Sequence, residues 1–164
     1  METVIVAFSG EKSCARVREI LEKSGTAECL VCRSADQVRR TVRQQRVAAV
    51  LCGYKFADGT AEELREDLPA SCPMLVTASQ ALLDLVQGEG LYKLASPLAR
   101  GELIDAVEEL LRRGAEEREL VARAKRRLME RYGLTEEAAH RQLQRLSMER
   151  RRKLVQTARA ILGE

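Results

Sequence analysis

The sequence has few aromatic residues and few of the groups that build catalytic or metal sites. Phenylalanine, tyrosine and tryptophan make up 3% of the 164 residues, tryptophan is absent, and histidine occurs once, as His140. A platform of aromatic side chains on which several bases stack is therefore not expected. The apolar runs are shorter than a membrane span requires, so we expect no membrane partner. No nucleophile–base pair, metal-ligand cluster or phosphate loop stands out, which argues against an enzyme and against a bound metal or cofactor.

The cysteines are odd in number and lie mostly in apolar runs; they are Cys14, Cys29, Cys32, Cys52 and Cys72. The opening residues lack the basic start and long apolar stretch of a signal peptide, so we expect a reduced, cytoplasmic protein. Cys29 and Cys32 have the spacing of a metal or redox motif. They lie in a strand-like run whose alternate residues point to opposite faces, and no second pair accompanies them. Burial as small apolar side chains is the favoured interpretation.

Charge is distributed unevenly along the chain. Residues 115–164 carry 13 lysines and arginines against 8 aspartates and glutamates, a net charge of +5. Residues 1–114 carry 15 against 17, a net charge of −2. Between residues 122 and 163, arginine and lysine occupy many outward positions of helical patterns. A compact basic helical segment indicates an acidic partner, of which nucleic acid is the commonest.

The first part of the chain alternates between short apolar runs and helical patterns. The expected strands cover residues 3–8, 27–32, 47–52, 73–77 and 91–95. The expected helices cover residues 13–23, 35–45, 61–68 and 80–86, with a loop around Asp58-Gly59. Fully apolar strands that alternate with helices are typical of a parallel sheet covered on both faces. The functional groups of such folds lie at the carboxyl ends of the strands.

A long helix is expected from about residue 99 to 131. Its middle, residues 112–119, is mostly charged, which suits a connector that pairs with its copy in a dimer. Gly133 is suited to ending this helix and Thr135 to capping the next, and a last helix is expected over residues 154–162. We therefore predict an α/β domain over residues 1–112, a helical linker over 113–121 and a three-helix domain over 122–164.

The five strand–helix units resemble the receiver domain of two-component systems, a doubly wound, five-stranded parallel fold of the flavodoxin type. The resemblance is best at residues 50–60. Receivers carry a phosphoacceptor aspartate after the third strand, an acidic pair that holds Mg²⁺ after the first, and a lysine after the fifth. The corresponding residues here are Gly53, Phe8 with Ser9, and Ser96. Only the hydroxyl residue after the fourth strand remains, as Thr77.

These replacements remove the groups that phosphorylation needs. Transfer of a phosphoryl group to a carboxylate requires the carboxylate, a cation and a lysine that pairs with the product. Gly53 has no side chain and Phe8 cannot bind Mg²⁺, so we predict a pseudo-receiver that is not phosphorylated at this position. Asp58 lies five residues beyond Gly53, but Asp-Gly there fits turn chemistry better. Ser9 and Thr77 fit two roles equally well, as helix caps or as the lining of a ligand pocket.

Residues 122–163 are similar to an ANTAR domain, a three-helix RNA-binding module of bacterial transcription antiterminators. The residues in register with its pattern are Ala124-Lys125, Leu128-Met129, Tyr132-Gly133, residues 135–139, Leu143, Arg145, Ser147, Arg152-Lys153 and Ala158. His140 stands where this pattern has Phe or Tyr, and we expect it to fill the same packing role. A receiver-like domain followed by a helical linker and this module is also the common arrangement in the family.

The resemblance implies a response regulator for transcription antitermination that binds paired hairpins in nascent mRNA leaders as a homodimer, close to RNA polymerase. Lysine and arginine supply phosphate attraction, and arginine also contacts bases or stacks on them. The RNA contacts expected from the pattern are Lys125, Arg145, Arg152 and Lys153. Ala124 and Met129 fit either RNA contact or the core, and Ser147 fits either RNA contact or a bond within its own helix.

Two other functions fit the same basic helices. One is a protein-interaction adaptor whose first domain docks a partner. The other is DNA binding through a helix-turn-helix-like pair around residues 132–135. Without a phosphoacceptor, the activating signal would be a ligand, a partner or RNA-driven dimerisation, or the protein would be constitutively active.

Overall fold

The computed structural model describes residues 1–88 and 90–164. The chain divides into two compact units, residues 1–114 and residues 115–164. Helix α5 (Arg100–Tyr132) contributes residues to both units. Within the described residues, no helix combines the length and the apolar character that a membrane span requires.

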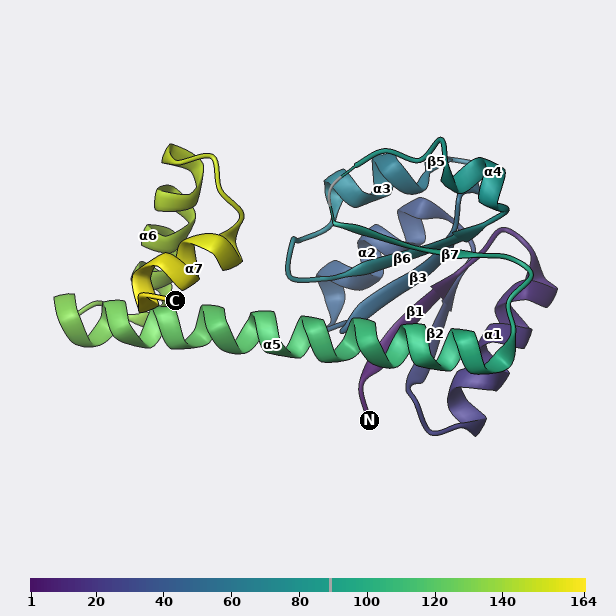
Figure 1. Cartoon of the computed structure of the whole chain (residues 1–164), viewed down its shortest axis with the longest axis horizontal. Coiled ribbons are helices and arrows are strands. Elements are labelled where there is room, and N and C mark those ends of the chain that lie inside the picture. The colour runs from purple at the N-terminus through teal and green to yellow at the C-terminus, as the bar shows by residue number, and fades with distance from the viewer. Residues whose placement is uncertain (89) are drawn as a thin grey trace. The chain divides into compact units, whose positions relative to one another are not determined.

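The first unit is built on a five-stranded parallel sheet with the strand order β2-β1-β3-β6-β7 (Figure 1). Its strands are β1 (Thr3–Ala7), β2 (Glu28–Cys32), β3 (Ala49–Gly53), β6 (Met74–Ala78) and β7 (Leu91–Ala95). Crossover connections between parallel strands require intervening segments, which here contain the helices. The expected parallel α/β fold is confirmed.

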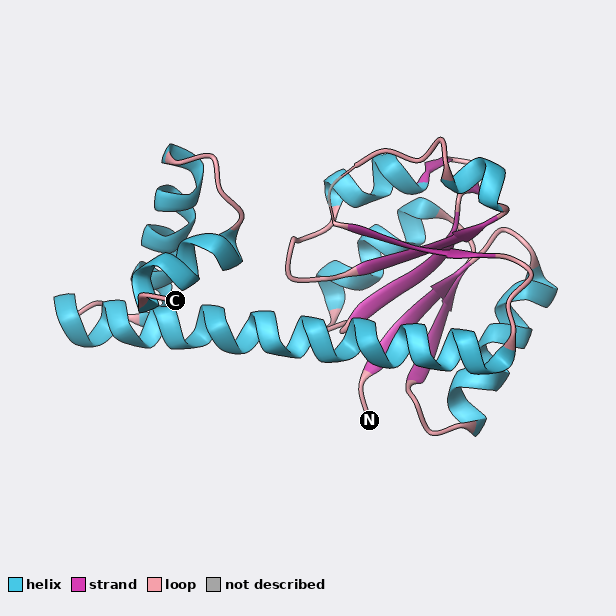
Figure 2. Cartoon of the chain, viewed as in Figure 1, coloured by secondary structure: helices cyan, strands magenta, loops and turns pink. Residues whose placement is uncertain are grey.

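Helices cover both faces of this sheet (Figure 2). The helices besides α5 are α1 (Glu11–Lys23), α2 (Ala35–Gln44), α3 (Ala61–Asp67) and α4 (Gln80–Leu83). Helices α1 and α5 share one buried apolar cluster, whereas α2, α3 and α4 share the other. Val4 lies in the first cluster and Ile5 in the second, because neighbouring residues of a strand point to opposite faces.

The two closely spaced cysteines of β2 follow the same rule. Cys29 belongs to the cluster under α1 and α5, and Cys32 to the cluster on the other face. Both are buried, and burial raises the pKa of Cys29 to about 11. Both are therefore core side chains on opposite faces of the sheet, as the alternation predicts.

Helix α4 is shorter than expected and ends at Leu83. From β7, Lys93 Nζ donates hydrogen bonds to the carbonyl oxygens of Leu83 and Val86, at 3.0 and 2.8 Å. A lysine ammonium can satisfy the carbonyl groups that the end of a helix leaves unpaired. The chain therefore leaves the helical path three residues before the expected end without unpaired carbonyl groups at these two positions.

The loop around Asp58 contains a two-stranded antiparallel ribbon formed by β4 (Lys55–Phe56) and β5 (Gly59–Thr60). The Asp58 carboxylate accepts hydrogen bonds from the backbone N–H groups of Asp36 and Ala35, both at 2.9 Å. These groups belong to the first turn of α2, where an anion is favourable. The two bonds hold the pKa of Asp58 below its usual value. Asp58 therefore caps a distant helix in addition to occupying the expected turn.

The second unit packs three helices around a small core. Its helices are the C-terminal part of α5, α6 (Glu136–Glu149) and α7 (Leu154–Leu162). The buried core residues are Ala124, Leu128, Ala139, Leu143 and Ala158. As expected, Gly133 after α5 is left-handed, with φ +65°, and the Thr135 hydroxyl caps α6 by accepting a hydrogen bond from the Ala138 N–H at 3.1 Å.

Candidate nucleic-acid interface

The carboxyl edge of the sheet brings together the positions at which a receiver would bind phosphate. Gly53 pairs with Thr77 in the register of β3 and β6, and the Ser96 N–H donates to the Ala78 carbonyl at 2.8 Å just beyond β7. Thr77 is buried, whereas Ser9 is exposed after β1. The edge therefore presents hydroxyl groups and no carboxylate at these positions.

Phe8 fills the space beside Gly53. A Cβ atom placed on Gly53 would lie 3.2 Å from Cδ1 of Phe8 and 3.8 Å from Cε1. Favourable contacts between carbon atoms lie at about 3.5–4.0 Å, so the shorter of these distances is crowded. The ring is 9% exposed and belongs to the cluster under α1 and α5. A side chain at position 53 would therefore press on a ring that is already held in the core.

The four expected RNA contacts all lie in the second unit and are at least partly accessible. Lys125 is half-buried on α5, and Arg145 is exposed on α6. Arg152 and Lys153 are exposed in the turn between α6 and α7. We call these four residues the basic set. They come from two helices and one turn, so the position of the turn decides how two of them are presented.

Two backbone hydrogen bonds fix this turn. The Arg151 N–H donates to the Met148 carbonyl at 3.3 Å, and the Arg152 N–H donates to the Ser147 carbonyl at 2.9 Å. Together they form the Schellman arrangement that ends many helices. It requires a left-handed residue after the helix, and Arg151 takes that conformation with φ +53°.

The same pair of bonds ends α1 and α7, where glycine takes the left-handed position. Gly25 and Gly163 have φ +72° and +77°. Glycine adopts this conformation without a steric penalty, whereas an L residue with a side chain is disfavoured there. Arg151 therefore places a charged side chain next to the basic set, in a backbone conformation that is less favourable for arginine than for glycine.

Replacing Arg151 with glycine is expected to stabilise the second unit by about 1 kcal/mol, because it relieves the left-handed strain. Urea unfolding followed by far-UV circular dichroism measures the change. The matched control is Arg150→Gly, since Arg150 precedes the turn with φ −95° and carries the same charge. Glycine at position 150 relieves no strain, so equal urea midpoints for the two variants would contradict the strain assigned to Arg151.

A buried hydroxyl pair supports the turn from within. Ser147 Oγ lies 2.8 Å from the Leu143 carbonyl oxygen and 2.8 Å from Thr157 Oγ1 on α7. Buried polar groups in native proteins are nearly always paired in this way. Ser147 thus makes the bond within its own helix, Ala124 is fully buried, and Met129 packs against the core. Of these three candidates, Ala124 and Ser147 are buried and Met129 is partly buried.

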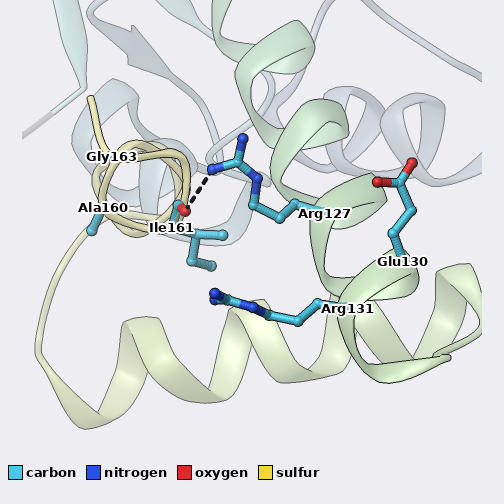
Figure 3. A pocket seen from close by; sticks show the side chains of 6 residues that line it. All are labelled: Arg127, Glu130, Arg131, Ala160, Ile161 and Gly163. Carbon is cyan, nitrogen blue, oxygen red and sulfur yellow. Dashed lines mark hydrogen bonds between the residues drawn. The ribbon is translucent and has the colours of Figure 1, made fainter.

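A pocket of about 440 Å³ lies beside α5 and α7 in the second unit (Figure 3). The residues that line it are Arg127, Glu130, Arg131, Ala160, Ile161 and Gly163. The side chains of Arg127 and Arg131 both extend toward the end of α7, and Arg127 Nη1 donates to the Ile161 carbonyl at 3.3 Å. The carboxylate of Glu130 points away from both guanidinium groups in Figure 3. The exposed side chains of Arg127 and Arg131 therefore both line this pocket near the C-terminal end of α5.

A five-stranded parallel α/β unit is thus followed along the chain by a small, basic three-helix unit. Residues 109–162 match the ANTAR domain family. This part of the chain is an ANTAR domain, and the resemblance expected from the sequence is confirmed. Among curated protein sequences, none matches the chain.

The N-terminal part has the fold of a receiver domain. A response regulator receiver domain protein from Clostridium thermocellum matches with a TM-score of 0.62 and 18% identity, over 69% of this chain and 96% of that one. A signal receiver domain of an HD domain-containing protein from Pseudomonas fluorescens Pf-5 matches with a TM-score of 0.65 and 19% identity, over 72% and 92%. A CheY-like receiver domain protein from Methanospirillum hungatei JF-1 gives 0.62 and 18%, over 71% and 98%. At these identities the likeness shows the fold.

Proposed function

We propose that this protein regulates transcription by binding RNA hairpins through its ANTAR domain and preventing termination. The observation that carries the proposal is the accessible basic set of the ANTAR domain, presented by two helices and a turn with fixed hydrogen bonds. Its lysines attract phosphate groups, and its arginines are suited to contacts with bases that a hairpin loop leaves unpaired.

A homodimer would bring two ANTAR domains to two hairpins of one leader. We propose that the two copies pair through the charged stretch of α5 at residues 112–119. A pair of bound hairpins would then hold the leader in a form that competes with the terminator hairpin. The response-regulator type of architecture supports such a role, because one domain receives a signal and the other acts.

Titration against three nucleic acids tests this function. The protein is mixed with a two-hairpin leader RNA, a duplex DNA of the same sequence and a scrambled RNA, each at two salt concentrations. We expect the hairpin RNA to bind most tightly and to keep its advantage at the higher salt concentration. Equal affinities would indicate charge attraction alone, a preference for duplex DNA would indicate a DNA-binding regulator, and no binding would favour a protein-interaction adaptor.

The second part of the proposal is that the receiver-like domain is not phosphorylated at position 53. Gly53 offers no nucleophile, Phe8 and Ser9 stand in place of a metal-binding acidic pair, and Ser96 stands in place of the lysine. A Cβ atom at position 53 would also lie only 3.2 Å from Cδ1 of the Phe8 ring. The signal that acts on this domain would then be something other than an aspartyl phosphate.

Gly53→Asp is expected to leave the protein unphosphorylated by a small phosphodonor such as acetyl phosphate. The new carboxylate has no acidic pair to hold Mg²⁺ and no lysine to pair with the product, and it is crowded by Phe8. Intact-mass spectrometry of the wild type and the variant measures the outcome, with an active receiver domain as the positive control. An acylphosphate on the Gly53→Asp variant alone would contradict this prediction. An acylphosphate on the wild-type protein, at Asp58 or elsewhere in residues 1–114, would show that the domain does receive an aspartyl phosphate.

A further inference from the structure

Tyr132 is an aromatic residue that the fold leaves in solvent. Phe8 and Phe56 are buried, and Tyr54 and Tyr92 are half-buried, whereas Tyr132 is 58% exposed. The sequence pattern places Tyr132 at the end of a helix and in register with the ANTAR pattern, but not among the expected RNA contacts. The structure places its ring on the surface of the basic unit, although the chain as a whole has too few aromatic residues for a stacking platform.

The position of Tyr132 explains its exposure. It is the last residue of α5, and the left-handed Gly133 directs the chain away at the next position. Arg131 and Arg127 precede it by one residue and by five, and both line the pocket beside α7 (Figure 3). An exposed tyrosine and two exposed arginines therefore lie within the last six residues of α5.

We propose that Tyr132 stacks on an unpaired base of the RNA hairpin loop while Arg127 and Arg131 attract the neighbouring phosphate. This inference rests on the proposed RNA binding. Bases in a duplex are already stacked on one another, whereas loop bases can splay out and stack on an aromatic side chain. Stacking tolerates any base, because each presents a π face. Tyr132 would therefore favour a loop over a stem, and not one loop sequence over another.

A second copy of the chain is the competing occupant of this surface. Like charges disfavour self-association here, because two exposed arginines precede Tyr132 on α5 and the second unit as a whole carries a net charge of +5. An acidic partner suits this charge. RNA also supplies the aromatic surface that would cover the ring.

The absence of tryptophan makes a direct test possible. Tyr132→Trp introduces a single tryptophan, whose fluorescence we expect hairpin RNA to quench as a base stacks on the indole. The matched control is Leu85→Trp, at a residue that is 70% exposed in the first unit. Its emission should stay unchanged at RNA concentrations that saturate the protein.

Affinity measurements complete the test. Tyr132→Ala should weaken hairpin RNA binding by roughly 5- to 150-fold, which corresponds to the loss of one stacked base. Tyr132→Phe should bind like the wild type, because the stacking face remains. Arg131→Gln should reduce the salt dependence of binding and leave the quenching of Tyr132→Trp intact at saturation.

Two results would overturn the stacking role while RNA binding stands. One is a wild-type protein that binds hairpin RNA with an affinity that Tyr132→Ala does not change. The other is a tryptophan at position 132 that is shielded before RNA is added, together with a shift from dimer to monomer in light scattering of Tyr132→Ala. A wild-type protein that binds no hairpin RNA would overturn the proposed function, and the stacking role with it.

Discussion

Replacement of Lys125 and Arg152 together with alanine is expected to lower the affinity for hairpin RNA by at least about 30-fold, since each specific contact contributes roughly 1–3 kcal/mol. Lys125 lies on α5 and Arg152 in the turn after α6, so the double variant removes contacts from two parts of the proposed interface. Both side chains are accessible at least in part, and their loss leaves the core intact. Filter binding or fluorescence anisotropy with a labelled two-hairpin RNA measures the change.

The matched control removes the same charge from the same unit. Arg141 and Arg159 are exposed on α6 and α7, outside the basic set. Arg141→Ala with Arg159→Ala lowers the net charge by two, as the test variant does, and should weaken binding only through the general phosphate attraction. If the two double variants lose affinity equally, the basic set has no special role.

Leu143→Ala is expected to unfold the second unit at room temperature or bring it close to unfolding. Leu143 is fully buried at the centre of a core that consists otherwise mainly of alanines. Truncation of such a leucine costs about 2–5 kcal/mol. A unit of 50 residues has a total stability of roughly 2.5–7.5 kcal/mol at the usual value per residue, so this loss removes most of it.

The two units can be followed separately in this experiment. All five cysteines lie in the first unit and are buried, so reactivity with a thiol reagent reports the unfolding of that unit alone. We expect Leu143→Ala to lose part of its helical circular dichroism while its thiols stay protected. Met148→Ala is the control, because Met148 lies on the same helix but is 80% exposed. Simultaneous loss of helicity and thiol protection would show that the two units unfold as one.

Much of the fold follows from short-range patterns in the sequence. Short, largely apolar runs mark the strands, and Gly133 and Thr135 mark the junction between α5 and α6 because each has a local structural requirement. The sequence pattern does not predict the β4–β5 ribbon, since strands of two residues are too short to show alternation. The early end of α4 depends on Lys93, which comes from a different strand.

The candidate sites depend more on contacts between distant residues. Turn chemistry predicts the Asp58-Gly59 bend, but not the bonds from the Asp58 carboxylate to α2, which join residues 22 and 23 positions apart. The left-handed Arg151 was not expected, because glycine is the usual signal for this conformation. The exposure of Tyr132 likewise depends on where α6 begins after the turn. The resemblance to the ANTAR pattern therefore predicted the basic set, and tertiary structure determines how it is held.

Because Phe8 lies against Gly53, the effect of a substitution at either position depends on the residue at the other. A carboxylate introduced at position 53 is crowded for as long as the ring remains, and removal of the ring while glycine remains leaves a void at the edge of the core. Loss of a buried phenylalanine side chain costs about 3–5 kcal/mol when no neighbour fills the space. The step that removes the ring before residue 53 changes thus passes through a less stable protein. Selection for folding would therefore favour keeping Phe8 for as long as residue 53 is glycine, whatever signal the domain receives.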